Sequence, residues 1–204
     1  MGLLSSSLAI TRYRVEGALP SPVMDSVRDG LQKYRIADID NDAADKAVGW
    51  TAWDSPFDPS FDGDAFIVGP YFVFSLRIDK KTIPPKIIKK QLTAEMARRL
   101  ADTGRPHLSR NEKREIRENI LHSLSLRIPA TPHVYELLWH PTDAWLWFFS
   151  TQKAANEELE TLFTKTFKAT LIRLFPHTLA DLNAGLSLEE RDRLSGLSPT
   201  RFKE

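Results

Sequence analysis

Two groups of charged residues in this sequence have types and spacing that could do chemistry. The first is a set of aspartates in the stretch DSPFDPSFDGD: Asp54, Asp58, Asp62 and Asp64. Carboxylates gathered in one loop can hold Mg²⁺ for a nuclease, whereas the prolines and glycine between them are typical of turns, in which aspartate is common. We therefore predict no metal site, no cofactor and no catalytic residues, and keep a Mg²⁺-dependent exonuclease as an alternative.

The second group is the lysine-rich stretch KKTIPPKIIKKQL, residues 80–92, which holds five lysines in thirteen positions. Lysine offers phosphate a compact point charge, while arginine is better suited to bidentate contacts with base edges. The stretch therefore favours contacts with a phosphate backbone that read no sequence. A solvated helix face is the other interpretation, because most lysine runs are of that kind.

Charge is distributed unevenly around this stretch, although the whole chain carries a formal charge of only +1. Residues 16–64 hold eleven acidic and four basic side chains, a net charge of −7. Residues 77–127 hold fourteen basic and six acidic side chains, a net charge of +8. The basic segment could bind a polyanion, or it could pair with the acidic segment of another subunit in a protein-interaction module without nucleic acid.

The basic segment predicts two helices joined as a hairpin. An apolar residue recurs at every fourth position of the first helix, and Lys86 and Lys90 project from its opposite side. These apolar positions are Ile88, Leu92, Met96 and Leu100. Ser109 and Glu112 form a capping box for the second helix. We predict that the following basic residues of the hairpin contact DNA: Lys80, Lys81, Lys86, Lys89, Lys90, Arg98, Arg99, Arg110, Lys113, Arg114 and Arg117.

The elements around the hairpin indicate a sheet. Alternating apolar and polar residues, turn signals and caps predict strands at 8–15, 47–53, 65–78 (broken at Gly69 and Pro70), 132–141, 143–150 and 169–175. Helices are expected from Ser21 and Pro22 to about Tyr34, from Pro84 to Asp102, from Ser109 to Leu126, at 153–168 and at 188–194. The fold class is therefore α+β, a mixed or antiparallel sheet core with flanking helices, interrupted by a basic helical hairpin.

We divide the chain into three parts on this basis. Residues 1–78 and 129–178 form a discontinuous sheet domain, residues 79–128 form the hairpin, and residues 179–204 form a polar tail with one short helix. The chain has no cysteine, which excludes disulfides and thiolate chemistry and suits a reducing, cytoplasmic compartment. No apolar run is long enough to cross a membrane, and no Walker, zinc-finger or helix-turn-helix motif is present.

Aromatic residues are concentrated in the predicted strands at 132–150, which end in DAWLWFFS. Trp139, Trp145, Trp147, Phe148 and Phe149 could form a stacking platform for single strands. In a hairpin with apolar residues on both faces, such residues more often belong to the core. We expect them to be core residues, with one face left over for a dimer contact.

Several short motifs together resemble the bacterial recombination-associated RdgC family. They are KTIPPKIIKKQL at 81–92, LHSLSLR at 121–127, Gly49-Trp50, Lys153-Ala154-Ala155, and the strand that ends near Phe175-Pro176. Each motif is short, but they occur in the order and at the spacing found in that family, over roughly residues 8–178.

The resemblance implies a non-enzymatic protein that binds duplex DNA with little sequence preference during recombination and replication. Members of this family are described as nucleoid-associated, ring-shaped homodimers that enclose DNA and restrain the recombinase RecA. The family has also been labelled a putative exonuclease. RdgC proteins are typically about a hundred residues longer at the C-terminus than this sequence, so an open clamp, a different dimer or a monomer are alternatives to a closed ring.

Overall fold

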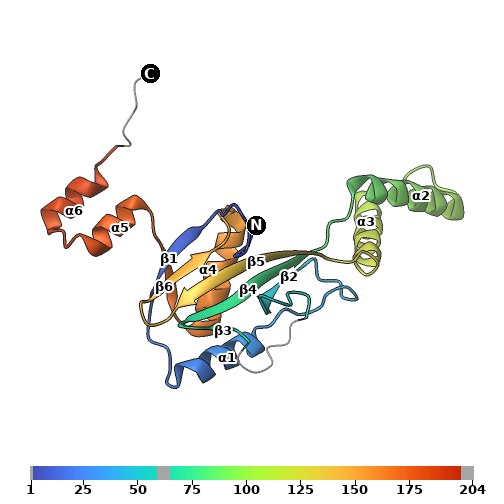
Figure 1. Cartoon of the computed structure of the whole chain (residues 1–204). Coiled ribbons are helices and arrows are strands. Elements are labelled where there is room, and N and C mark those ends of the chain that lie inside the picture. Colours follow the sequence, from blue (N-terminus) through green and yellow to red (C-terminus); the bar gives the residue numbers. More distant parts are fainter. Residues whose placement is uncertain (1, 59–64, 199–204) are drawn as a thin grey trace.

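A curved antiparallel sheet forms the body of the protein (Figure 1). The computed structural model describes residues 2–58 and 65–198. The strands are β1 (Thr11–Glu16), β2 (Lys46–Thr51), β3 (Ile67–Val68), β4 (Tyr71–Lys80), β5 (Thr131–His140), β6 (Trp145–Phe148) and β7 (Thr170–Arg173). Their order is β2-β4-β5-β6-β1-β7, with β3 also paired to β4, and all pairings between them are antiparallel. The α+β prediction is confirmed.

Two helices cover one face of the sheet (Figure 1). They are α1 (Val23–Lys33) and α4 (Lys153–Phe167). Successive side chains of a strand point to opposite faces of the sheet, so every second one faces these helices. The apolar side predicted for α4 is buried against that face. That side consists of Leu159, Leu162, Phe163 and Phe167. Helix α1 begins after Pro22, one residue later than a Ser21 cap would require, and Pro22 is its N-cap without a side-chain hydrogen bond.

Gly49 lets β2 approach the segment that follows α1. Ile36 N–H donates to the Trp50 carbonyl, and Trp50 N–H donates to the Tyr34 carbonyl, both at 2.9 Å. A Cβ at position 49 would lie 2.4 Å from both the Cα and the N of Ile36. The close contact between two backbones therefore requires glycine at this position.

Gly49→Ala is expected to destabilise the protein by about 2 kcal/mol, the cost of overpacking against atoms that cannot rotate away. Urea unfolding followed by tryptophan fluorescence measures the change. Gly196→Ala is the matched control, because its Cβ would come no nearer than 3.6 Å to other atoms. Equal midpoints for the two variants would mean that the chain relaxes around residue 49.

A helical hairpin extends from the ends of β4 and β5, away from the sheet (Figure 1). It consists of α2 (Pro85–Thr103) and α3 (Arg110–Ser125). Its apolar cluster is separate from the sheet core, and the predicted stripe of α2 packs in it. The buried members are Leu108, Ile116, Ile120 and Leu124, with Ile83, Ile88, Leu92, Met96, Leu100 and Ile128 packed against them. The hairpin thus has a small core of its own.

The end of the described chain differs from the prediction of one short helix. Two helices follow β7, α5 (Pro176–Asn183) and α6 (Leu188–Ser195), and they project from the sheet at the end opposite the hairpin (Figure 1). The sequence predicts the end of a strand at Pro176, whereas Pro176 begins α5, because proline is also favoured in the first turn of a helix. Within residues 2–58 and 65–198, no helix is long and apolar enough to span a membrane.

Candidate functional site

Both helices of the hairpin present basic side chains without acidic partners. Lys80 closes β4, and Lys86, Lys89 and Lys90 occupy the first two turns of α2. Three more recur in the first half of α3 at spacings of three and four residues, which places them on one side of the helix. They are Arg110, Lys113 and Arg117.

All seven of these side chains are exposed. In the part of the chain that the structure describes, none of them makes an ion pair. A helix rises 1.5 Å per residue, so the nineteen residues of α2 extend over about 28 Å. Duplex DNA carries one charge per 1.7 Å of its axis, and a stretch as long as α2 carries roughly seventeen phosphates.

Three other predicted residues have acidic neighbours within the hairpin. Arg98 binds Glu95 at 2.7 Å, and this hydrogen bond raises the pKa of Arg98 and lowers the pKa of Glu95. Arg99 lies 3.6 Å from Glu115 on α3, and Arg114 lies 3.5 Å from Glu118. Their charges are partly balanced, so a polyanion would gain less from them than from the seven unpaired residues.

The structure gives Lys81 a different role from the predicted one. This side chain is only 5% exposed, and its ammonium group donates to three backbone carbonyls. The acceptors are Asp42 at 2.7 Å, Asp40 at 3.1 Å and Ser125 at 2.5 Å. Since Ser125 ends α3, the lysine satisfies a helix carbonyl that has no partner within the helix. Lys81 therefore joins the acidic loop to the base of the hairpin and has no donor left for phosphate.

The predicted capping box at the start of α3 is present. Glu112 N–H donates to Ser109 Oγ at 3.2 Å, and Ser109 N–H donates to the Glu112 carboxylate at 2.8 Å. Arg105, in the loop before the helix, also binds this carboxylate. The hydrogen bond from Arg105, followed by those from Ser109, lowers the pKa of Glu112 to about 2. The turn that presents Arg110 and Lys113 is therefore fixed by an ionised carboxylate.

This capping box is expected to make the hairpin sensitive to acid. A carboxylate with a lowered pKa stabilises the folded state above its unfolded pKa, near 4.5, and that stabilisation is lost as the pH falls towards 2. Hydrogen exchange of α3 amides between pH 5 and pH 2 should show earlier opening than the sheet. Glu112→Gln should weaken this dependence, while Glu118→Gln, outside the box, should keep it. An unchanged profile in Glu112→Gln would contradict the prediction.

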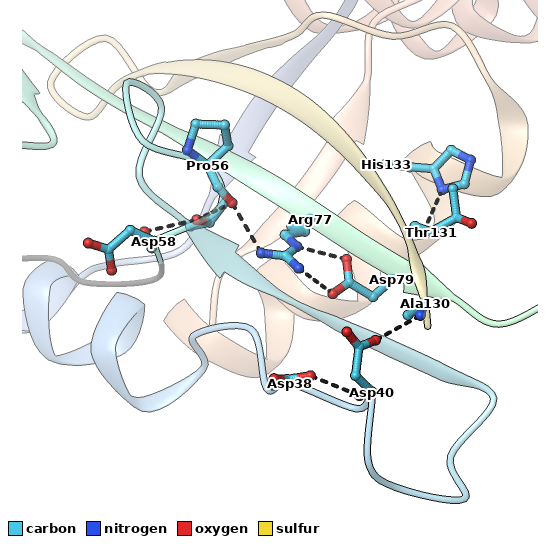
Figure 2. Close-up of polar contacts among 10 residues, drawn as sticks. Asp38, Asp40, Pro56, Asp58, Arg77, Asp79, Ala130, Thr131 and His133 are labelled. Carbon is cyan, nitrogen blue, oxygen red and sulfur yellow. Dashed lines mark hydrogen bonds and ion pairs between the residues drawn. The ribbon is translucent and has the colours of Figure 1, made fainter. Parts of the chain in front are cut away.

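Asp38 and Asp40 of the acidic segment bind backbone N–H groups near the base of the hairpin (Figure 2). Asp40 accepts from the backbone N–H of Ala130 at 2.7 Å, and Asp38 accepts from the N–H of Asp40 at 2.8 Å. Arg77 binds Asp79 through two bonds of 2.7 Å. The bond from Ala130 to Asp40 holds the acidic loop beside the base of the hairpin in the same chain.

The predicted aspartate cluster is only partly described. Asp54 and Asp58 lie in the turns after β2, whereas Asp62 and Asp64 lie outside the described residues. Among the residues that the structure describes, no three His, Asp or Glu side chains are grouped so that they could hold a metal ion.

The aromatic residues of β5 and β6 divide between the two faces of the sheet. Trp139 and Phe148 are buried in the core, and Phe149 is also buried, as expected. Trp147 is 39% exposed on the face that the helices do not cover. Sequence reasoning missed that Arg12 and Arg14 of β1 lie beside this face, opposite Trp147 and Trp145. The alternation of residues 8–15 put both arginines on one face, but only the strand pairing brings the tryptophans next to them.

Comparison with known proteins gives one clear match. A family model described as "RdgC: Putative exonuclease, RdgC" matches residues 9–182. This region contains the whole sheet, the hairpin and nearly all of α5. A search of curated proteins found no match.

Proposed function

The chain belongs to the RdgC family, and from this premise we propose that it binds DNA without sequence preference through its basic hairpin. Membership of the family indicates a function related to recombination. The observation that carries the proposal is the set of seven exposed, unpaired cations on a hairpin that projects from the sheet. Each phosphate that such a cation neutralises releases counterions, which favours binding at low salt.

The arrangement of these cations favours backbone contacts over reading of bases. Four of the seven are at the start of the hairpin, and all four are lysines, which act as point charges. Direct readout needs donors and acceptors aimed at base edges from an element that fits a groove. The exposed face of α2 offers ammonium groups and few side chains of that kind. The protein is therefore expected to bind unrelated duplexes with similar affinity.

The experiment that tests this function is fluorescence anisotropy with duplexes of unrelated sequence across a salt series. Affinity should fall on a log-log plot with a slope of about −0.9 for each phosphate contacted. It should change little between sequences. Absence of binding even at low salt would overturn the proposal and leave the hairpin as a solvated or protein-facing surface.

The family description includes exonuclease, and we propose instead that the protein binds DNA without catalysis. The hairpin supports binding because its unpaired groups are cations, which hold phosphate but do not by themselves cleave it. Incubation of end-labelled duplex with protein and Mg²⁺ distinguishes the two activities. Degradation that is lost in Asp62→Asn/Asp64→Asn would replace this proposal with the nuclease.

The proposal also covers oligomeric state, location and partner. We propose that the protein is a homodimer and that it is associated with the nucleoid in the cytoplasm. By occupying duplex DNA, it would restrain RecA. Analytical ultracentrifugation with and without a short duplex measures the assembly. Strand exchange by RecA, with protein added before or after the recombinase, measures the restraint. If inhibition persists under salt conditions that abolish DNA binding, RecA itself would be the partner.

A further inference from the structure

The face of the sheet opposite the helices carries a row of aromatic side chains: Tyr71, His140 and Trp145 are half-buried, and Trp147 is exposed. In β6, Leu146 and Phe148 point to the helix-covered core and are fully buried. Trp145 and Trp147 alternate with them and therefore point to the opposite face. Trp147 remains 39% exposed there, whereas tryptophan is highly buried on average.

The aromatic rings on this face touch one another in sequence across neighbouring strands. The ring centroids of Trp145 and Trp147 are 5.0 Å apart. His140 stacks on Trp145 at 5.3 Å with an interplanar angle of 20°, and Tyr71 lies 5.8 Å from Trp145. Each ring restrains the next, so the row is held in place before any ligand binds. The exposed Trp147 ring is at its end.

Two arginines flank this row on the next strand. Arg12 of β1 is paired in register with Trp147, and Arg14 with Trp145. Both arginines are exposed, and within the described residues neither side chain has a hydrogen bond or an ion pair. Glu16, the next charge on this side of β1, lies beyond the last residue paired with β6. The surface therefore combines aromatic rings with two unpaired arginines beside Trp145 and Trp147, while Asp143 lies 3.5 Å from His140 at the other end of the row.

We propose that this aromatic row, with Arg12 and Arg14, is a stacking site for the unpaired bases of single-stranded DNA, separate from the hairpin. A single strand offers an exposed base face and a phosphate together, which match a ring and an adjacent guanidinium. Duplex DNA keeps its bases stacked inside and cannot use the rings. The inference deepens the proposed function and rests on it, because it assigns a second class of DNA to a second surface.

A second copy of the chain fits this face less well. A two-fold interface centred on Trp147 would bring the arginines of both copies together and remove them from water without a partner. Burial of unpaired charge is costly, whereas a phosphate backbone supplies the opposite charge. Figure 1 places β1 and β6 on the side of the sheet away from the hairpin, so the two surfaces can be tested independently.

The test measures the affinity of the protein for two ligands in parallel: a labelled oligothymidylate of about 16 nucleotides and a blunt duplex of unrelated sequence. Trp147→Ala should weaken binding of the single strand by about 5-fold to 150-fold, the range for loss of one stacked base. Trp147→Phe should restore most of that loss, and both variants should bind the duplex as the unaltered protein does. In Arg12→Gln/Arg14→Gln, the salt slope for the single strand should fall by up to about 1.4.

The outcomes separate this inference from the proposed function. If the unaltered protein binds no oligothymidylate, or if Trp147→Ala binds it normally, the proposed stacking site is wrong. The proposal of duplex binding is then decided separately by the measurements with the duplex. If the protein binds oligothymidylate with dependence on Trp147 but no duplex, the hairpin proposal fails and the stacking site remains. If Trp147→Ala converts a dimer to a monomer with unchanged affinity for the single strand, the face is a subunit interface and the inference is wrong.

Discussion

Alanine at Lys86, Lys89 and Lys90 together is expected to cost the protein most of its affinity for duplex DNA. These lysines are exposed, occupy two adjacent turns of α2 and make no ion pair within residues 2–58 and 65–198. Three lost contacts should lower the salt slope by up to about 2.7. At 1 M salt, counterion release no longer favours binding, so the variant and the unaltered protein should have equal affinity there. At 0.1 M salt, the variant should bind duplex DNA up to about 500-fold more weakly than the unaltered protein.

Anisotropy over the salt series, with the oligomeric state measured in parallel, checks this prediction. The control for net charge is alanine at Lys33, Lys153 and Lys165, which removes the same charge from α1 and α4, where Lys153 pairs with Glu157 and the other two lie over Tyr34. An equal effect of both triple variants would mean that only net charge matters. If the hairpin variant loses its oligomeric state but keeps its affinity for DNA, the basic surface pairs with protein, and the charge-complementary interaction module would replace the DNA interface.

Lys81→Met is expected to have the largest effect on stability among the basic residues of the hairpin. The ammonium group donates to carbonyls of Asp40, Asp42 and Ser125, and methionine would leave these acceptors without their donor inside the protein. A buried polar group that loses its partner costs about 1–3 kcal/mol. Because water can reach some of the three acceptors in the variant, we expect a loss of about 3 kcal/mol in the free energy of unfolding.

Urea unfolding and hydrogen exchange at the base of the hairpin measure this loss. Lys80→Met is a close control, since its side chain is exposed and has no partner in the described part of the chain. It should change stability by less than about 0.5 kcal/mol but lower the salt slope for DNA by about 0.9. If Lys81→Met instead kept the stability of the unaltered protein and lost affinity for DNA, Lys81 would contact phosphate.

Much of the secondary structure could be predicted because its signals are local. The capping box of Ser109 and Glu112, the break at Gly69 and Pro70, and the four-residue stripe of α2 each lie within one turn or one helix. The structure confirms all three. The α+β class followed from the order of these elements. Helix α5 was missed where a local signal had two meanings, since a proline can end a strand or begin a helix.

The sequence by itself determined most of the elements, the basic character of the hairpin and the family, because periodicity, caps and charge depend on neighbours in the chain. Only the tertiary structure decided which charges are available. Lys81 and Lys80 are adjacent in sequence, yet Lys81 is buried by residues about forty positions away in both directions. Strand pairing likewise set Arg12 beside Trp147, 135 residues later. Contacts of this kind join segments that are distant in the sequence, and no pattern of neighbouring residues encodes them.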